Sequence, residues 1–179
     1  MRKIILYIAQ TLDGYIADLN DGFSFLHEYD SVESIQTSYQ ALTKRIDTVI
    51  MGRKTYDVIN QMGNYPYSDF KSYIVTSKTL NQSNEKIEFV DDVVKLVKKL
   101  KETEGKDVWL VGGGILIETF MKHSLIDEYM IAIIPKLIGQ GKRLFNPINH
   151  YEKLKLLNIG KMQEIVMLTY GKIGQQNEL

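Results

Sequence analysis

The chain has 179 residues, with 22 basic and 22 acidic side chains, 44% hydrophobic residues and a formal net charge of zero. These values are typical of one folded domain of the commonest size. The neutral balance argues against a nucleic-acid partner, which selects a basic surface. The absence of cysteine excludes thiolate metal sites and cysteine nucleophiles, and the three histidines lie too far apart in the sequence to predict a metal site.

The chain carries no evident targeting or membrane segment. An apolar run follows Arg2 and Lys3, but it is too short for a signal peptide and has no small-residue cleavage site. No stretch approaches the ~20 apolar residues of a membrane helix. We therefore expect a cytoplasmic protein without membrane contact. A single domain is expected over residues 1–173, followed by a polar, disordered tail at 174–179.

The first half of the chain alternates apolar runs with helical spacing. The run Ile4–Ala9 is typical of a strand buried on both faces, and Ser31 is a candidate N-cap for the helix after it. In chain order, the predicted elements are strand Ile4–Ala9, helix 31–45, strand Thr48–Met51, helix 53–60, strand Tyr73–Thr76 and strand Ile87–Val90.

The second half begins with the clearest helix, 91–101, which has acids at its start and lysines at its end, as the helix dipole prefers. The elements that follow are strand Val108–Val111, helix 115–122, strand Ile126–Ile134 and the strands 153–159 and 163–171, joined by a turn at Gly160. The alternation predicts an α/β fold with a mostly parallel sheet covered on both faces, and antiparallel strands at its C-terminal edge.

Two predicted strands end in glycine and lead directly into a helix. At the first junction, Gly52 is followed by Arg53, Lys54 and Thr55. The unpaired N–H groups of a helix start favour a phosphate, and the two cations and the hydroxyl would add to that site. The alternative is a glycine turn before a solvated basic helix start.

At the second junction, Gly112, Gly113 and Gly114 follow a buried strand. Three glycines cost conformational entropy, which is justified where a backbone must approach a ligand closely; a tight turn is the alternative. Both junctions are expected at the carboxyl ends of parallel strands, where ligands of α/β sheets bind. The patch Thr76-Ser77-Lys78 follows a third strand and is either a further phosphate contact or a polar loop.

In this order the motifs resemble those of the dihydrofolate reductase superfamily. The similarity is greatest to the reductase domain of the bifunctional riboflavin-biosynthesis deaminase-reductase and its stand-alone relatives, over roughly residues 2–171. The segments that carry the resemblance are Ala9 with Leu12–Ala17, Ile50–Tyr56, Thr76-Ser77, Val111–Gly114, Ile126–Glu128 and Pro135–Phe145.

The resemblance implies a three-layer α/β/α fold, NADPH as hydride donor and a homodimer. Arg53, Lys54 and Lys78 supply charge that suits the 2′-phosphate of NADPH. The dimer surface is expected on the strand Tyr129–Ile134 and the segment after Pro135. The cofactor-binding residues that the resemblance implies are Ala9, Ile16, Gly52, Arg53, Lys54, Thr55, Thr76, Ser77, Lys78, Val111, Gly112, Gly113, Gly114, Ile115 and Leu116.

The first helix departs from the folate enzymes, which carry there a carboxylate that faces the pterin. Gln36 falls near that position, Glu33 lies one turn earlier, and Glu28 and Asp30 lie in the preceding loop. The candidate catalytic residues are Asp13 and Glu33; Asp13 either orients a polar substrate or caps its own loop. The expected substrate contacts are Gln10, Phe23, Gln36 and Tyr56.

Three functions remain open at this point. The first is an NADPH-dependent reductase of a small heterocyclic or carbonyl-type substrate, similar to 5-amino-6-(5-phosphoribosylamino)uracil reductase. The second is a true dihydrofolate reductase, in which Glu33 or Asp30 replaces the missing acid. The third is a non-catalytic protein that binds NADPH. Hydride transfer asks little of protein side chains, so a changed first helix points to a changed substrate more than to a lost reaction.

Overall fold

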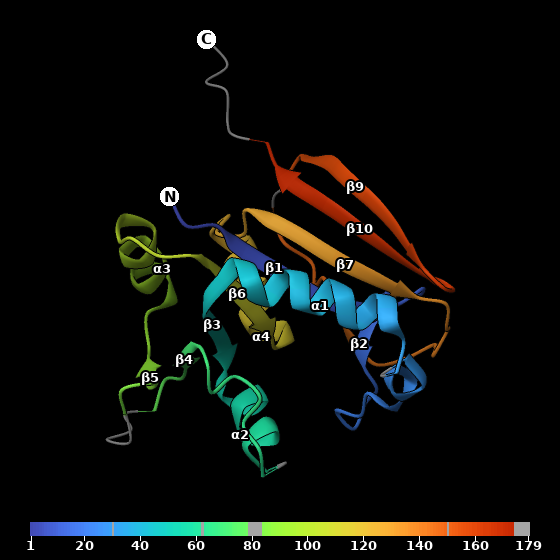
Figure 1. The fold of residues 1–179 in the computed structure, drawn as a ribbon, viewed down its shortest axis with the longest axis horizontal. Helices are drawn as coiled ribbons and strands as arrows, with labels where there is room; N and C mark the ends of the chain where they lie inside the picture. Colours follow the sequence, from blue (N-terminus) through green and yellow to red (C-terminus); the bar gives the residue numbers. More distant parts are fainter. Residues whose placement is uncertain (30, 62, 79–83, 150, 174–179) are drawn as a thin grey trace.

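The computed structural model of the chain describes residues 1–29, 31–61, 63–78, 84–149 and 151–173. The predicted tail at 174–179 and the candidate acid Asp30 lie outside these ranges. Helices and strands alternate along most of the chain, and the last two long strands form a hairpin that extends past the helices (Figure 1).

A central sheet organises the molecule and confirms the predicted fold class. Within the described residues it has eight strands in the order β5-β4-β3-β6-β1-β7-β10-β9. The ladders from β5 to β7 are parallel, and those that join β7, β10 and β9 are antiparallel. The strands are β1 Ile4–Thr11, β3 Ile46–Gly52, β4 Lys71–Val75, β5 Ile87–Val90, β6 Asp107–Gly112, β7 Glu128–Ile134, β9 Leu154–Met162 and β10 Ile165–Lys172.

A second, two-stranded ribbon pairs β2 (Tyr15–Ala17) with β8 (Lys142–Arg143). Neither strand is predicted from the sequence, because each is too short to show an alternating pattern. The ribbon joins the loop after β1 to the segment after β7, which are more than 120 residues apart in the chain.

The α-helices lie close to their predicted positions; they are α1 Glu33–Arg45, α2 Arg53–Gln61, α3 Val93–Glu102 and α4 Gly114–Lys122. The 3₁₀ helix η1 Ser24–Tyr29 is not predicted from the sequence. The prediction of Ser31 as N-cap is wrong: Val32 occupies the N-cap position of α1, with no side-chain cap hydrogen bond. In α3 the Asp92 carboxylate caps the helix by accepting from the N–H of Lys95.

The predicted turn at Gly160 is also wrong. Gly160 lies within β9 opposite Met167, and the hairpin turns at Gln163, whose φ is 55°. A two-residue connection with positive φ fits the twist of antiparallel strands, so the turn forms there. The alternation of side chains then continues through Gly160 on the face that packs against Met167.

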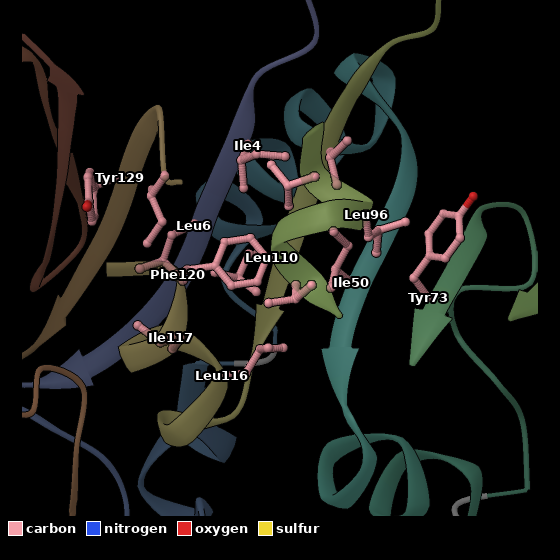
Figure 2. Packing of buried hydrophobic residues seen from close by; sticks show 14 of the residues in the cluster. Ile4, Leu6, Ile50, Tyr73, Leu96, Leu110, Leu116, Ile117, Phe120 and Tyr129 are labelled. Carbon is pink, nitrogen blue, oxygen red and sulfur yellow. The ribbon is translucent and has the colours of Figure 1, made fainter. Parts of the chain in front are cut away.

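Two cores cover the two faces of the central strands. Because side chains alternate along a strand, Ile4 and Leu6 point to the core under α3 and α4, while Ile5 points to the core under α1. Figure 2 shows Phe120 and Ile117 of α4 and Leu96 of α3 packed over β1, β3 and β6 in the first of these cores. The result is the expected three-layer α/β/α arrangement.

The strand β7 lies inside the sheet, between β1 and β10. The prediction that Tyr129–Ile134 forms a dimer surface is therefore wrong, because most of its side chains are buried in the cores of the same chain. Apolar side chains are exposed instead on the terminal hairpin, where Leu156, Ile159 and Val166 remain accessible.

Ion pairs tie together the amino ends of the parallel strands. Arg45 donates to both oxygens of the buried Glu128 at 2.9 and 3.1 Å and to Asp107 at 3.2 Å. Arg2 pairs with Asp47 in the same region. This network lies at the end of the sheet opposite the glycine junctions, so it stabilises the fold without occupying the candidate site.

Candidate functional site

The two glycine junctions meet at the carboxyl edge of the sheet. Met51 of β3 lies opposite Gly112 of β6 in the ladder, so α2 and α4 begin side by side. A Cβ on Gly113 would lie 3.2 Å from the Thr55 hydroxyl oxygen. The junction predicted to bind a phosphate and the junction predicted to approach a ligand closely are thus in contact with one another.

The backbone of the first junction leaves room for a ligand. A Cβ on Gly52 would meet no atom within 4 Å, so this end of β3 faces open space. Gly112 and Gly113 have φ values of 140° and 105°, which favour glycine. The Cβ positions of Gly112 and Gly113 meet Ile8 and Thr55, so the open backbone is at Gly52, next to the starts of two helices, and this fits the phosphates of a dinucleotide.

The cations at this edge differ in their partners. Arg53 donates to Asp57 at 2.6 Å within α2, and its guanidinium lies 5.6 Å from the ring centroid of Phe89. Lys54 and Lys78 are exposed, and no carboxylate of the described residues forms an ion pair with either. The charge available for a phosphate is therefore carried by the two lysines as well as by Arg53.

The patch after β4 is fixed through its backbone. Thr76 donates its N–H to the carbonyl of Val90 at 2.8 Å, and its hydroxyl accepts from the N–H of Lys78 at 3.2 Å. Ser77 and Lys78 remain exposed beyond the strand end. The patch is thus an ordered polar loop at the same edge as the glycine junctions.

Asp13 holds two loops together. Its Oδ1 accepts from the Thr11 hydroxyl at 2.5 Å, and its Oδ2 accepts from the N–H groups of Ile138 and Gly139 at 3.0 and 2.7 Å. The Thr11 hydrogen bond, together with those from the backbone, holds the pKa of Asp13 below its ordinary value. The carboxylate therefore caps backbone N–H groups, but those of the segment after β7 rather than those of its own loop as the sequence suggested.

A second acid lies close to the same ribbon. Asp21 has a left-handed φ of 66° and pairs with Lys142 of β8. The hydrogen bond from Lys142, with the charges of Lys142 and Lys54, lowers the pKa of Asp21. The loop that contains Asp21 therefore faces the basic start of α2.

Sequence reasoning did not single out Arg143 as a site residue. It pairs with Tyr15 in the β2–β8 ribbon, and its carbonyl oxygen lies 3.7 Å from the Cβ position of Gly114. In the sequence, the only indication of a role for Arg143 is its position in the Pro135–Phe145 segment. Its contact with the glycine turn, Gly112–Gly114, forms only when the chain folds.

The predicted substrate contacts are spread around this edge. Gln10 is half-buried near the end of β1, and Phe23 packs edge-on against His27 with ring centroids 5.8 Å apart. The ring of Tyr56, in α2, packs edge-on against the rings of Tyr65 and Phe89 and so helps to hold the helix in place.

The acidic and amide candidates of the first helix are exposed. Glu33 is the first residue of α1, a position that the helix dipole favours for an acid, and Gln36 lies one turn along the same helix. Neither is buried against the sheet.

The apolar candidates divide by exposure. Ala9, Ile16 and Val111 are half-buried, Leu116 is buried in the core, and Ile115 in the first turn of α4 is 82% exposed. Leu116 can therefore meet a ligand only through its backbone, whereas Ile115 offers an apolar side chain at the edge of the site.

The candidate site belongs to a chain in which no helix of the described residues is long and apolar enough to cross a membrane. Comparison with known proteins identifies relatives over nearly the full length. The profile of the RibD C-terminal domain matches residues 2–168. The protein YwjB of Bacillus subtilis (strain 168) is 32% identical over 171 residues, covering 94% of this chain and 97% of YwjB.

Solved structures agree with this match. A putative riboflavin biosynthesis protein from Shewanella sp. PV-4 superposes with a TM-score of 0.84 at 28% identity, over 96% of this chain and 99% of that one. Dihydrofolate reductase from Enterococcus faecalis, solved with NADP(H), gives a TM-score of 0.68 at 17% identity, over 95% and 96% of the two chains. The second likeness shows the shared fold alone.

Proposed function

Because the chain belongs to the RibD C-terminal domain family, we propose that it is an NADPH-dependent reductase that transfers a hydride to a small heterocyclic or carbonyl-type substrate. The observation that carries the proposal is the contact between the two glycine junctions, where Gly113 lies against Thr55 and Gly52 faces open space. Family membership and a dihydrofolate reductase-like fold support a reductase; the cofactor and the substrate class are the parts proposed here.

The residues at this edge fit a phosphorylated dinucleotide. Helix starts at Arg53 and Gly114 provide unpaired N–H groups, and Thr55 provides a hydroxyl between them. Gly52, whose Cβ position is open, allows the backbone to approach the ligand without a side chain in between. When bound, NADPH supplies the hydride, while the protein supplies position and charge.

The choice of NADPH over NADH follows from charge. The 2′-phosphate adds close to two negative charges, and Arg53, Lys54 and Lys78 lie on the segments that follow β3 and β4. Among the described residues neither Lys54 nor Lys78 forms a close ion pair with a carboxylate, although Lys54 interacts electrostatically with Asp21, so binding the phosphate would not require such a pair to break.

On the substrate side, we propose that Gln10, Phe23, Gln36 and Tyr56 form the rim and that Asp13 positions the loop around it. A polar but non-ionisable Gln36 in place of an acid favours a substrate other than folate. The resemblance to 5-amino-6-(5-phosphoribosylamino)uracil reductase makes a pyrimidine of this kind the first substrate to test.

We also propose that the protein is a homodimer. The exposed apolar side chains of the β9–β10 hairpin, Leu156, Ile159 and Val166, are candidates for its interface. The cytoplasm, expected from a sequence without cysteine, remains a prediction.

The decisive experiment is a titration of the purified chain with NADPH and with NADH, followed by thermal unfolding. A ligand at a hundredfold excess over its Kd stabilises the folded state by about 2.7 kcal/mol. We expect a larger rise in Tm with NADPH than with NADH at moderate salt, and then oxidation of NADPH in the presence of a pyrimidine, pterin or nitro substrate.

Each other outcome selects an alternative. Turnover of dihydrofolate with methotrexate binding would favour a true dihydrofolate reductase. Stabilisation by NADPH without turnover of any substrate tested would favour a non-catalytic binding protein. No stabilisation by either nucleotide would overturn the proposed cofactor and leave the fold assignment intact.

A further inference from the structure

The four arginines of the chain differ in how their charge is neutralised. Three of them form ion pairs: Arg2 pairs with Asp47, Arg45 pairs with both Glu128 and Asp107, and Arg53 pairs with Asp57. Within the described residues, no carboxylate forms an ion pair with Arg143. Its guanidinium lies instead over the ring of Tyr15, 5.0 Å from the centroid, and donates to the Tyr15 hydroxyl at 3.4 Å.

The backbone on either side of Arg143 is held tightly. The next residue, Leu144, is 1% exposed and donates its N–H to the carbonyl of Gly14 at 3.0 Å. Two residues earlier, a Cβ on Gly141 would lie 2.3 Å from the carbonyl oxygen of Ala17, so only glycine allows the chains to cross there. Arg143 is therefore presented from a fixed position, with four of its five N–H donors not engaged by Tyr15.

This position lies beside the glycine turn. The carbonyl of Arg143 is 3.7 Å from the Cβ position of Gly114, the first residue of α4, and Gly113 lies against Thr55. An anion at this turn would meet the first N–H groups of α4 and the Thr55 hydroxyl. A guanidinium carried on the adjacent strand is the group that binds phosphate oxygens in pairs.

We propose that Arg143 binds a phosphate group in this site, brought by the pyrophosphate of the dinucleotide or by the substrate; the inference rests on the proposed reductase function. The Tyr15 ring supports the guanidinium, and the missing carboxylate partner leaves its charge for the ligand. The residue thus adds a full positive charge on the α4 side of the site, in addition to the cations at the start of α2 and after β4.

The test compares the full-length chain with Arg143→Gln, Arg143→Lys and the control Lys161→Gln, which removes one positive charge from β9, away from the site. Thermal unfolding first establishes that each variant is folded. The probes are NADPH, 2′-AMP, which carries the 2′-phosphate but neither phosphate of the pyrophosphate, and inorganic phosphate added with and without NADPH. Binding is measured by calorimetry at two salt concentrations.

If the phosphate belongs to the dinucleotide, Arg143→Gln weakens NADPH binding about ten- to hundredfold, because a charge-assisted hydrogen bond is lost, and leaves 2′-AMP binding unchanged. If it belongs to the substrate, NADPH binds equally, and inorganic phosphate binds the NADPH complex of the wild type but not that of the variant. Arg143→Lys, which keeps the charge and loses the paired donors, falls between the two, and it serves in place of Arg143→Gln if that variant does not fold.

Equal binding of all probes by Arg143→Gln and the wild type would overturn the proposal, as would an equal loss in Lys161→Gln. The failure of the reductase assignment would look different, because the wild type itself would not bind NADPH. In that case the phosphate titration of the free chain still decides the role of Arg143: binding lost only in the Arg143 variants supports it, and no binding by the wild type contradicts it.

Discussion

Gly52 and Gly113 border the same site in different backbone conformations. Alanine at Gly113 would strain the fold itself, because its φ is 105° and Thr55 lies 3.2 Å from the new Cβ. Gly52 has no positive φ, and its Cβ position is open. We predict that Gly52→Ala keeps or slightly raises Tm but weakens NADPH binding about tenfold or more, since overpacking a close contact costs roughly 1–3 kcal/mol.

Gly160→Ala is the matched control for this change. It lies in β9, where its Cβ would meet Met167 at 3.6 Å, an ordinary contact. Calorimetric titration with NADPH should give the wild-type Kd for Gly160→Ala and a raised Kd for Gly52→Ala. A wild-type Kd for Gly52→Ala would show that no ligand approaches the end of β3.

At the scale of residues, the sequence predicted the glycines of the candidate site better than the surroundings of its charged residues, Asp13 and Arg143. The three consecutive glycines and the Gly52 junction are visible in the sequence because glycine has a direct backbone meaning. The partners of Asp13 are not visible, because they are N–H groups 125 and 126 residues away. Arg143 likewise acquires its surroundings only when β8 pairs with β2.

At the scale of elements, the hydrogen bonds of Asp13 with Thr11, Ile138 and Gly139, called the Asp13 clamp below, join the loop after β1 to the segment after β7. The pKa of Asp13 is lowered in the folded state, so the clamp contributes stability above the unfolded pKa, which is about 3.9, and loses it as the pH falls through the folded pKa. We predict that Asp13→Asn lowers Tm at neutral pH and flattens the decline of Tm below about pH 5.

The exposed Asp69→Asn, in the loop before β4, serves as control and should keep the wild-type dependence of Tm on pH. The measurement also separates the two roles considered for Asp13. A variant with wild-type Tm at every pH but no turnover would refute the clamp and favour direct action on the substrate.

Long apolar elements were predictable, whereas short connecting ones were not. Apolar runs or helical spacing in the sequence indicate the long elements β1, β3, β6 and α3. The ribbon of β2 and β8 has no such pattern, since a two-residue strand is defined only by its partner. The turn was predicted at Gly160 because glycine is typical of turns. Its actual position at Gln163 depends on the register of the hairpin, which the sequence does not show.

For the whole molecule, the exposed face of the terminal hairpin is the test of assembly. Leu156, Ile159 and Val166 are 45%, 60% and 38% exposed, and their ladder partners place them on one face. We predict a dimer mass in light scattering at micromolar concentration, and a monomer mass for Ile159→Lys with unchanged circular dichroism. The added charge would have to be buried in the interface without a partner.

Leu137→Lys provides the comparison, because Leu137 is also exposed but lies in the segment after β7. This variant should remain a dimer. If Leu137→Lys dissociates the protein and Ile159→Lys does not, the interface lies on the segment after Pro135; a monomeric wild type would remove the dimer altogether.

The place of β1 in the middle of the sheet has a consequence for biosynthesis. This strand leaves the ribosome before both of its neighbours, β6 and β7, which begin more than 100 residues after its start. The nascent chain must therefore carry an apolar strand with both edges unpaired until β6 has emerged, and with one edge unpaired until β7 follows. Such non-local pairing slows folding and exposes the chain to aggregation, so co-translational chaperones are expected to bind the β1 segment Ile4–Thr11.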